Sequence, residues 1–143
     1  MLYEDFRTLA WDEPRWPNFT AKEFACPCGC HHTWHWPDFF DRLQSLRERL
    51  AKPLRINSGH RCFAHNRAVG GTPGSQHRTL AVDLSTRGFD RETRLTLDRL
   101  AHEAGFAGLG YYWTFLHLDL GPDRFWYGNR ADTDALKAHW GHR

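Results

Sequence analysis

The 143-residue chain contains no long apolar run, no long run of lysine and arginine, and little excess of charge of either sign. A helix that crosses a membrane needs about 20 consecutive apolar residues, so we expect no membrane insertion. The net charge of +2 gives no electrostatic reason for a nucleic-acid partner. Without a basic stripe, the aromatic side chains are not expected to stack on single-stranded nucleic acid either.

The chain also has no recognisable signal peptide, internal repeat, low-complexity tract or linker. Residues 1–16 are acidic early and lack the basic start and apolar core of a secretory signal. We therefore expect synthesis in the cytoplasm, followed by release or delivery if the target lies outside the inner membrane. Charged residues at 25% and apolar residues at 41% are typical of globular proteins, so we expect residues 1–143 to form one monomeric domain.

Local patterns predict helices and strands that are interspersed without regular β–α–β alternation. In the clearest helix, Phe39, Leu43 and Leu46 recur at helical spacing on one face. A later helix has Asp90 as its N-cap and Gly105 as the residue that ends it. The mixture favours an α+β fold. The expected helices cover residues 37–50, 61–74 (a short helix and then a turn), 89–106 and 132–140. The expected strands cover residues 53–57, 80–85, 108–112 and 115–120. Residues 11–37 are expected to be irregular.

The segment FLHLDL, residues 115–120, carries the first sign of chemistry. Successive side chains of a strand point to opposite faces, so the leucines share one face while His117 and Asp119 share the other. The leucine face must be buried. An imidazole and a carboxylate on the second face are costly unless a cleft or a metal uses them, although a solvent-exposed face would accommodate both without cost.

A metal site becomes the stronger hypothesis when His117 is considered with His77 and Asp83 of the segment SQHRTLAVDL. Two imidazoles and one carboxylate are a usual set of protein ligands for a catalytic zinc ion, which keeps a fourth position for water or substrate. Asp83 falls in a strand and His77 in the loop before it. Adjacent strands could therefore bring Asp83 and His117 together while the loop delivers His77.

Three stretches, INSGHRCFAHNRAVGG, SQH…AVDL and GLGYY…FLHLDLG, resemble the zinc D-alanyl-D-alanine carboxypeptidases and related peptidoglycan peptidases. More narrowly, they resemble the compact versions found in bacteriophages and prophages. The resemblance runs from about Phe19 to Gly121. It implies a Hedgehog/D-Ala-D-Ala peptidase-like α+β fold, with a small antiparallel sheet flanked by helices, and one catalytic zinc ion held by His77, Asp83 and His117.

The resemblance also implies roles for two further residues. Arg61 matches the arginine that contacts the substrate near the scissile bond, and its planar set of donors suits a terminal carboxylate or a developing oxyanion. Ser75 matches the serine expected near the substrate. Zinc would polarise the scissile carbonyl and acidify water. The implied activity is hydrolysis of peptidoglycan stem peptides, by a D-Ala-D-Ala carboxypeptidase or an endopeptidase, so the expected partner is a stem peptide.

The chain departs from the family pattern between His77 and Asp83. The spacing is one residue shorter than in many relatives, and the usual glycine has no counterpart. A deletion within the strand would reverse its two faces, so we expect the connecting turn to absorb the change.

A second departure concerns the general base. Thr114 stands where many relatives have a glutamate or aspartate, and its hydroxyl cannot serve as the base. Asp119 could accept the proton of water, or it could orient His117. His60 or His139 could also assist, and the residue pattern leaves these alternatives open.

The four cysteines raise a separate question. Cys26, Cys28 and Cys30 lie among histidines in CPCGCHHTWH, and Cys62 follows Arg61. A second, structural zinc site is one interpretation, but Cys-x-Cys-x-Cys lacks the paired Cys-x-x-Cys spacing of ordinary zinc knuckles. Free or partly oxidised thiols in a packed loop are the alternative, and Cys62 could be a fourth ligand or a disulfide partner.

We therefore predict a zinc metallopeptidase of phage or prophage origin, with Arg61 and Asp119 as catalytic residues and Ser75 in substrate binding. A non-catalytic, zinc-stabilised cell-wall-binding or virion module of the same fold is the alternative, which Thr114 keeps open. A metal-free structural protein of the virion is a third interpretation, and it predicts no stoichiometric zinc.

Overall fold

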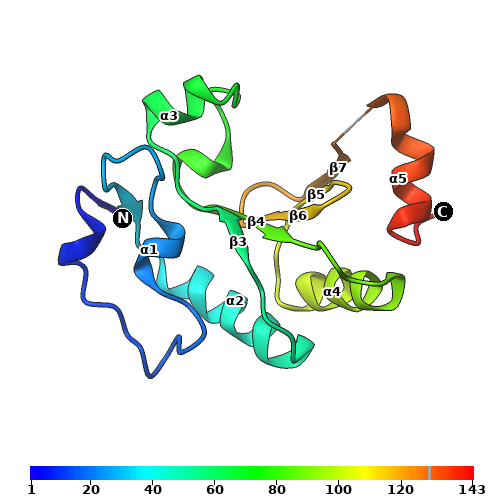
Figure 1. The fold of residues 1–143 in the computed structure, drawn as a ribbon, viewed down its shortest axis with the longest axis horizontal. Helices are drawn as coiled ribbons and strands as arrows, with labels where there is room; N and C mark the ends of the chain where they lie inside the picture. Colours follow the sequence, from blue (N-terminus) through cyan, green and yellow to red (C-terminus); the bar gives the residue numbers. More distant parts are fainter. Residues whose placement is uncertain (129) are drawn as a thin grey trace.

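The computed structural model describes residues 1–128 and 130–143 of the chain. At its centre is a five-stranded sheet with the strand order β3-β4-β6-β5-β7 (Figure 1). Neighbouring strands are antiparallel except for β5 and β7, which run parallel. The strands are β3 (Ile56–Ser58), β4 (Ala81–Ser85), β5 (Gly108–Tyr111), β6 (Phe115–Asp119) and β7 (Arg124–Tyr127).

The α+β class is confirmed, and each of the four predicted strands overlaps an observed one. The sheet differs from the expected antiparallel one at its edge, where β7 joins it parallel to β5. This strand was not predicted, because it has only four residues and follows a Gly-Pro turn directly. A segment of that length shows too little alternation to be distinguished from a loop.

Two long helices cover the apolar face of the sheet. They are α2 (Pro37–Leu50) and α4 (Arg91–Glu103), and both lie below the sheet in Figure 1. Leu116 and Leu118 of β6 are fully buried in a core that includes side chains of both helices, so the predicted leucine face is confirmed. The opposite face of β4 and β6 carries most of their polar side chains, including Asp83, His117 and Asp119.

The predicted ends of α4 are also confirmed. The Asp90 carboxylate accepts a hydrogen bond from the Thr93 N–H at 2.8 Å, and Gly105 just beyond the helix has a φ of +90°, which only glycine adopts easily. Two shorter helices are α3 (Phe63–Ala68), which lies above the sheet in Figure 1, and α5 (Thr133–His139), which lies beyond β7. No described helix is both long and apolar enough to cross a membrane.

The N-terminal segment is more regular than predicted. It contains the antiparallel pair β1 (Leu2–Tyr3) and β2 (Thr33–Trp34), the short helix α1 (Ala21–Phe24) and the 3-10 turn η1 (Phe6–Thr8). Trp11, Trp16 and Phe24 surround Phe40 of α2, with ring centroids 4.8 to 5.1 Å from that ring. Aromatic packing of this kind anchors the segment to the core.

Candidate active site and metal centre

Asp83 and His117 meet because of the register between β4 and β6. The two residues are direct cross-strand partners, and both lie on the face opposite the leucines, as period-two alternation requires. His117 Nδ1 lies 3.0 Å from Asp83 Oδ1. Both side chains are buried, so the interpretation of this face as solvent-exposed is wrong.

His77 comes from the 3-10 turn η2 (Gln76–Arg78) that precedes β4. Ser75 caps this turn, because its Oγ accepts a hydrogen bond from the His77 N–H at 3.2 Å. His77 Nε2 lies 3.2 Å from Asp83 Oδ1 and 3.2 Å from His117 Nδ1. The shortened spacing between His77 and Asp83 is therefore absorbed in the turn, as predicted, and the strand keeps its faces.

The outer ring nitrogens of the two histidines are held by oxygen acceptors. His77 Nδ1 lies 2.7 Å from the carbonyl oxygen of Gly59, and His117 Nε2 lies 2.7 Å from Asp119 Oδ2. A carbonyl or carboxylate oxygen can only accept, so each of these nitrogens carries a proton and donates. In the neutral rings, His77 Nε2 and His117 Nδ1 therefore present lone pairs toward Asp83.

Three electron-pair donors thus converge in a buried position. Their mutual distances of 3.0 and 3.2 Å are close to the roughly 3.4 Å edge of a tetrahedral set whose ligand bonds measure about 2.0–2.1 Å. Buried acceptors at such distances repel one another unless a cation lies among them. The donor set therefore fits a divalent metal ion such as zinc.

A proton is the other cation that can satisfy this arrangement. Burial lowers the pKa of His117, but hydrogen bonds to Asp119 and Asp83 outweigh burial, and the net result is a raised pKa. Burial would likewise raise the pKa of Asp83, yet its close contacts with the two imidazoles outweigh burial and keep the pKa below its usual value. Asp83 is thus an anion in either case, available to a proton-bearing ring or to a metal ion.

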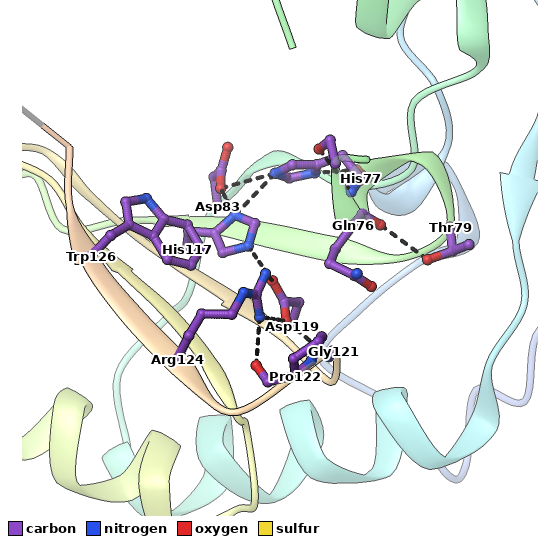
Figure 2. Close-up of polar contacts among 12 residues, drawn as sticks. Gln76, His77, Thr79, Asp83, His117, Asp119, Gly121, Pro122, Arg124 and Trp126 are labelled. Atoms are coloured by element: carbon purple, nitrogen blue, oxygen red, sulfur yellow. Dashed lines mark hydrogen bonds and ion pairs between the residues drawn. The ribbon is translucent and has the colours of Figure 1, made fainter. Parts of the chain in front are cut away.

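Asp119 lies on the far side of the His117 ring from Asp83 (Figure 2). Its carboxylate is fully buried and accepts two hydrogen bonds from Arg124, at 2.7 and 2.8 Å, and one from the Gly121 N–H at 2.9 Å. Burial would raise the pKa of Asp119, but its bonds with His117 and Arg124 outweigh that effect and lower the pKa. These contacts hold a fixed carboxylate behind the imidazole.

Gly108 allows this arrangement, because a Cβ at that position would collide with Asp119 Oδ1 and Arg124 Nη1. We expect Gly108→Ala to reduce the free energy of unfolding by about 1–3 kcal/mol, measured by urea denaturation. Gly74→Ala is the matched control, because a Cβ there meets nothing within 4 Å, and its stability should stay within about 0.5 kcal/mol of the parent. Equal midpoints for the two variants would contradict the packing argument.

A cavity of about 310 Å³ lies over the three donors. Arg61 lines it, with Nη2 3.7 Å from Asp83 Oδ2 and Nε 3.3 Å from Ser58 Oγ. Ser75 lines it as well. The structure therefore brings five of the predicted site residues together and leaves Asp119 outside the lining. The other lining residues are Thr72, Gly74, Gln76, Tyr112, Arg124 and Trp126.

The two histidines considered as assisting bases do not line this cavity. His60 lines a neighbouring cavity of about 950 Å³, and its Nδ1 lies 2.7 Å from the carbonyl oxygen of Thr79. His139, at the end of α5, packs against Trp113. Among the described residues that line the site, Asp83 is the only carboxylate. The cavity therefore holds no second carboxylate from these residues to act as a base.

Sequence reasoning missed Arg124 of β7. Residues two apart on a strand share a face, and Arg124 and Trp126 both lie toward the site in Figure 2. The Trp126 ring centroid is 5.0 Å from that of His117, and the Arg124 guanidinium lies 5.1 Å over the Trp126 ring. The sequence offered only a weak signal, an arginine and a tryptophan two residues apart after Gly121, which is too short an alternation to identify a strand.

A second cluster of metal-ligand side chains is formed by cysteines. The sulfur atoms of Cys26, Cys28, Cys30 and Cys62 all lie within 4.8 Å of one another. The first three follow α1 and the fourth follows β3, so the fold brings together two segments that are far apart in the chain.

Comparison with known proteins agrees with the site geometry. A family model described as Peptidase M15 matches residues 17–119, which span the three donors, Arg61 and all four cysteines. A search of curated proteins finds no match. The family is zinc-dependent, and the residues of this chain fit that metal by donor type and distance. With most of its length matched, the chain belongs to the peptidase M15 family of zinc D-Ala-D-Ala carboxypeptidase-like metallopeptidases.

Proposed function

We propose that this metallopeptidase hydrolyses peptide bonds in the stem peptides of bacterial peptidoglycan. The observation that carries the proposal is the convergence of three buried electron-pair donors, from His77, Asp83 and His117, beneath a cavity that Arg61 also lines. Membership of the peptidase M15 family supplies the reaction class. The substrate class rests on the resemblance of the motifs around these residues to peptidoglycan peptidases.

In this proposal, His77 Nε2, Asp83 Oδ1 and His117 Nδ1 hold the zinc ion. When bound, zinc supplies Lewis-acid polarisation of a carbonyl oxygen and makes water more acidic. The protein contributes the orientation of the donors, because the Gly59 carbonyl and Asp119 fix the two ring tautomers. All three side chains are largely buried, which limits their contact with bulk solvent to the side that faces the cavity.

Arg61 is proposed to bind the substrate. Its guanidinium is largely buried, with 17% of the side chain exposed, and it faces Asp83 at a distance too long for a strong hydrogen bond. Donors that the protein leaves incompletely used are suited to a carboxylate or to the oxyanion of a carbonyl under attack. Ser75 is proposed to lie near the substrate, although its Oγ already accepts from the His77 N–H.

Asp119 is proposed to orient His117 and not to act as the general base. The Asp119 carboxylate contacts His117 Nε2, the ring nitrogen that points away from His77 and Asp83. Arg124 and the Gly121 N–H occupy the remaining acceptor sites of the carboxylate. A base must reach the proton that it removes. Asp119 has no such access, so its effect must pass through the imidazole.

The Asp119→Asn variant tests this role. Loss of an orienting carboxylate typically lowers metal affinity or activity by about 10–100-fold, so we expect zinc affinity, measured with a competing chelator, to fall by roughly that factor. A carboxylate that acted only as a base would leave zinc affinity unchanged while turnover fell. Asp123→Asn, which removes an exposed carboxylate on the same turn, is the control and should change neither quantity.

The surrounding cavities favour an endopeptidase over a strict carboxypeptidase. The site cavity and the larger cavity beside it share Arg61, Gly74, Ser75 and Gln76 as lining residues. The two cavities therefore adjoin at these residues, and we propose that a substrate extends from one to the other past Arg61. A closed pocket would select a free terminal carboxylate, whereas a continuous groove admits a longer stem or a crosslinked peptide.

The site of action is part of the proposal. The cell wall lies outside the cytoplasmic membrane, so the protein would reach its substrate after release or delivery. A phage- or prophage-encoded enzyme has such a route during lysis or infection. This assignment rests on the resemblance of the motifs to the compact phage and prophage peptidases.

One observation favours a second candidate function, a zinc-stabilised module that binds the cell wall without hydrolysis. Thr114 occupies the position at which many relatives have their base, and Asp83 is the only carboxylate among the described lining residues. A protein of this kind would keep its metal and bind peptidoglycan without turnover.

The experiment that separates the two functions uses the purified, zinc-loaded protein. It is incubated with peptidoglycan and, separately, with a peptide that ends in D-Ala-D-Ala, each with and without a chelator. We expect new stem-peptide fragments from peptidoglycan and their loss with the chelator. Sedimentation with peptidoglycan in the absence of any chelator-sensitive cleavage would refute the peptidase and favour the binding module.

A further inference from the structure

The four cysteines form a compact cluster outside the proposed active site. The Cys26 and Cys28 sulfurs are 3.4 Å apart, those of Cys28 and Cys62 are 3.6 Å apart, and all four lie within 4.8 Å of one another. Cys26 is buried and Cys28 is exposed, while Cys30 and Cys62 are partly buried. The cluster therefore lies at the surface with one side in the protein.

The sulfur spacing fits a tetrahedral thiolate site. Zinc–sulfur bonds of about 2.3 Å place the sulfurs of a tetrahedron about 3.8 Å apart. A pair of disulfides would instead divide the four residues into two bonded couples. Here Cys28 is almost equally close to Cys26 and to Cys62, which is the arrangement of one shared centre.

The backbone around the cluster donates to the sulfurs. The His32 N–H donates to Cys30 Sγ at 3.4 Å, and the His65 N–H donates to Cys62 Sγ at 3.3 Å. Such bonds stabilise negative charge on sulfur and orient metal-bound thiolates. Two of the four sulfurs thus accept hydrogen bonds from the backbone, as metal-bound thiolates commonly do.

The chain bends sharply so that three closely spaced cysteines can converge. Gly29 has a φ of +92°, and His31, which is not a glycine, has a φ of +66°. Left-handed backbone is uncommon outside glycine and persists where the surroundings require it. These two bends bring the cysteines of Cys-x-Cys-x-Cys together, as the turn of an ordinary Cys-x-x-Cys motif does for its two cysteines.

Charge balance also indicates a cation. The nearest arginine in the sequence, Arg61, directs its guanidinium toward Asp83 and Ser58. Several thiolates this close together are stable only with a positive ion between them.

We propose that Cys26, Cys28, Cys30 and Cys62 hold a second, structural zinc ion. Four sulfur ligands form the closed set that structural zinc sites use, with no position left for substrate. The ion would fasten the N-terminal segment to the loop after β3. Such a tie matters in this segment, because its regular elements are short.

The position of Cys62 gives the structural ion a link to the active site. Cys62 is next to Arg61, and the Arg61 N–H donates to the His77 carbonyl oxygen at 2.6 Å. In the same loop, the Gly59 carbonyl accepts from His77 Nδ1. A zinc ion bound to Cys62 would therefore act as a positioning group for the loop that carries Arg61 and supports His77. This consequence for activity rests on the proposed function, whereas the metal site itself does not.

The test is a metal count on protein purified under reducing conditions without chelator. We expect about two zinc ions per chain in the parent, about one in His117→Ala and about one in Cys62→Ser. Cobalt substitution then identifies the ligands, because thiolate ligands give an intense sulfur-to-cobalt charge-transfer band. We expect the band in the parent and in His117→Ala, and its loss in Cys62→Ser.

Either of two results would overturn the second site. One is a parent with about one zinc ion that disappears in His117→Ala. The other is the absence of a charge-transfer band in both the cobalt-loaded parent and the cobalt-loaded His117→Ala protein. Should Cys62→Ser fail to fold, the parent and His117→Ala proteins still decide the question. Failure of the peptidase assay would leave the cobalt spectrum unaffected, so the two proposals can fail separately.

Discussion

The His77→Ala and His117→Ala variants are each expected to lose the zinc ion of the active site and nearly all peptidase activity. Each substitution removes one of three donors whose mutual distances are 3.0 to 3.2 Å. Zinc contributes several kcal/mol of charge stabilisation in the transition state, and about 1.4 kcal/mol is a factor of ten in rate. Activity should therefore fall by about 10³-fold or more.

The measurement pairs zinc content by mass spectrometry with turnover of peptidoglycan on the same preparation. His102→Ala is a suitable control, because His102 is exposed on α4 and does not line the site cavity. It should keep both zinc and activity. Full zinc content together with parental turnover in either donor variant would show that the metal lies elsewhere.

Arg61→Ala is expected to have the second largest effect, a fall in kcat/KM of about 10²–10³-fold, the usual result of removing one donor to a developing oxyanion. Arg61 lines the cavity and lies beside Asp83, but it is not one of the three metal donors. Zinc content should therefore stay at the parental level. Arg61→Lys should recover only part of the activity, because an ammonium group cannot reproduce the planar pair of donors.

Arg67→Ala serves as the control for the two Arg61 variants. Arg67 is an exposed arginine of α3, the short helix that follows the loop with Arg61. It should retain parental kinetics. Parental kcat/KM in Arg61→Ala would remove Arg61 from the proposed mechanism. Loss of zinc in that variant would instead assign the residue to support of Asp83.

The sequence predicts structure best where the alternation of apolar and polar side chains along a strand matches the burial of the two faces of that strand. The alternation in FLHLDL placed the leucines in the core and His117 and Asp119 on the other face, and the structure confirms this. The same reasoning required the shortened spacing before Asp83 to fall in a turn. The ends of α4 were predictable because each depends on local backbone geometry. Asp90 accepts a hydrogen bond from an N–H three residues later, and Gly105 adopts a positive φ.

The features that the sequence did not predict depend on contacts between distant segments. The parallel pairing of β7 with β5 places Arg124 beside Asp119, and no local pattern encodes that neighbour. The orientation of the His117 ring also depends on these contacts, because Asp119 binds Nε2 and leaves Nδ1 toward Asp83. For Cys62 the sequence left a fourth ligand and a disulfide partner as alternatives, and the sulfur positions depend on how the β3 loop lies against the segment after α1.

The role of Asp119 illustrates the limit of face-based reasoning. Alternation assigns His117 and Asp119 to one face of β6, which made the carboxylate a candidate for the base. The structure shows that its oxygens are committed to His117, Arg124 and the Gly121 N–H. A shared face therefore does not establish shared access to the cavity.

The most direct test of the account is a crystal of the zinc-loaded protein, with an anomalous difference map collected at the zinc absorption edge. The account predicts a peak about 2.0–2.2 Å from each of His77 Nε2, Asp83 Oδ1 and His117 Nδ1. A catalytically active crystal form with no anomalous peak among these three atoms would contradict it.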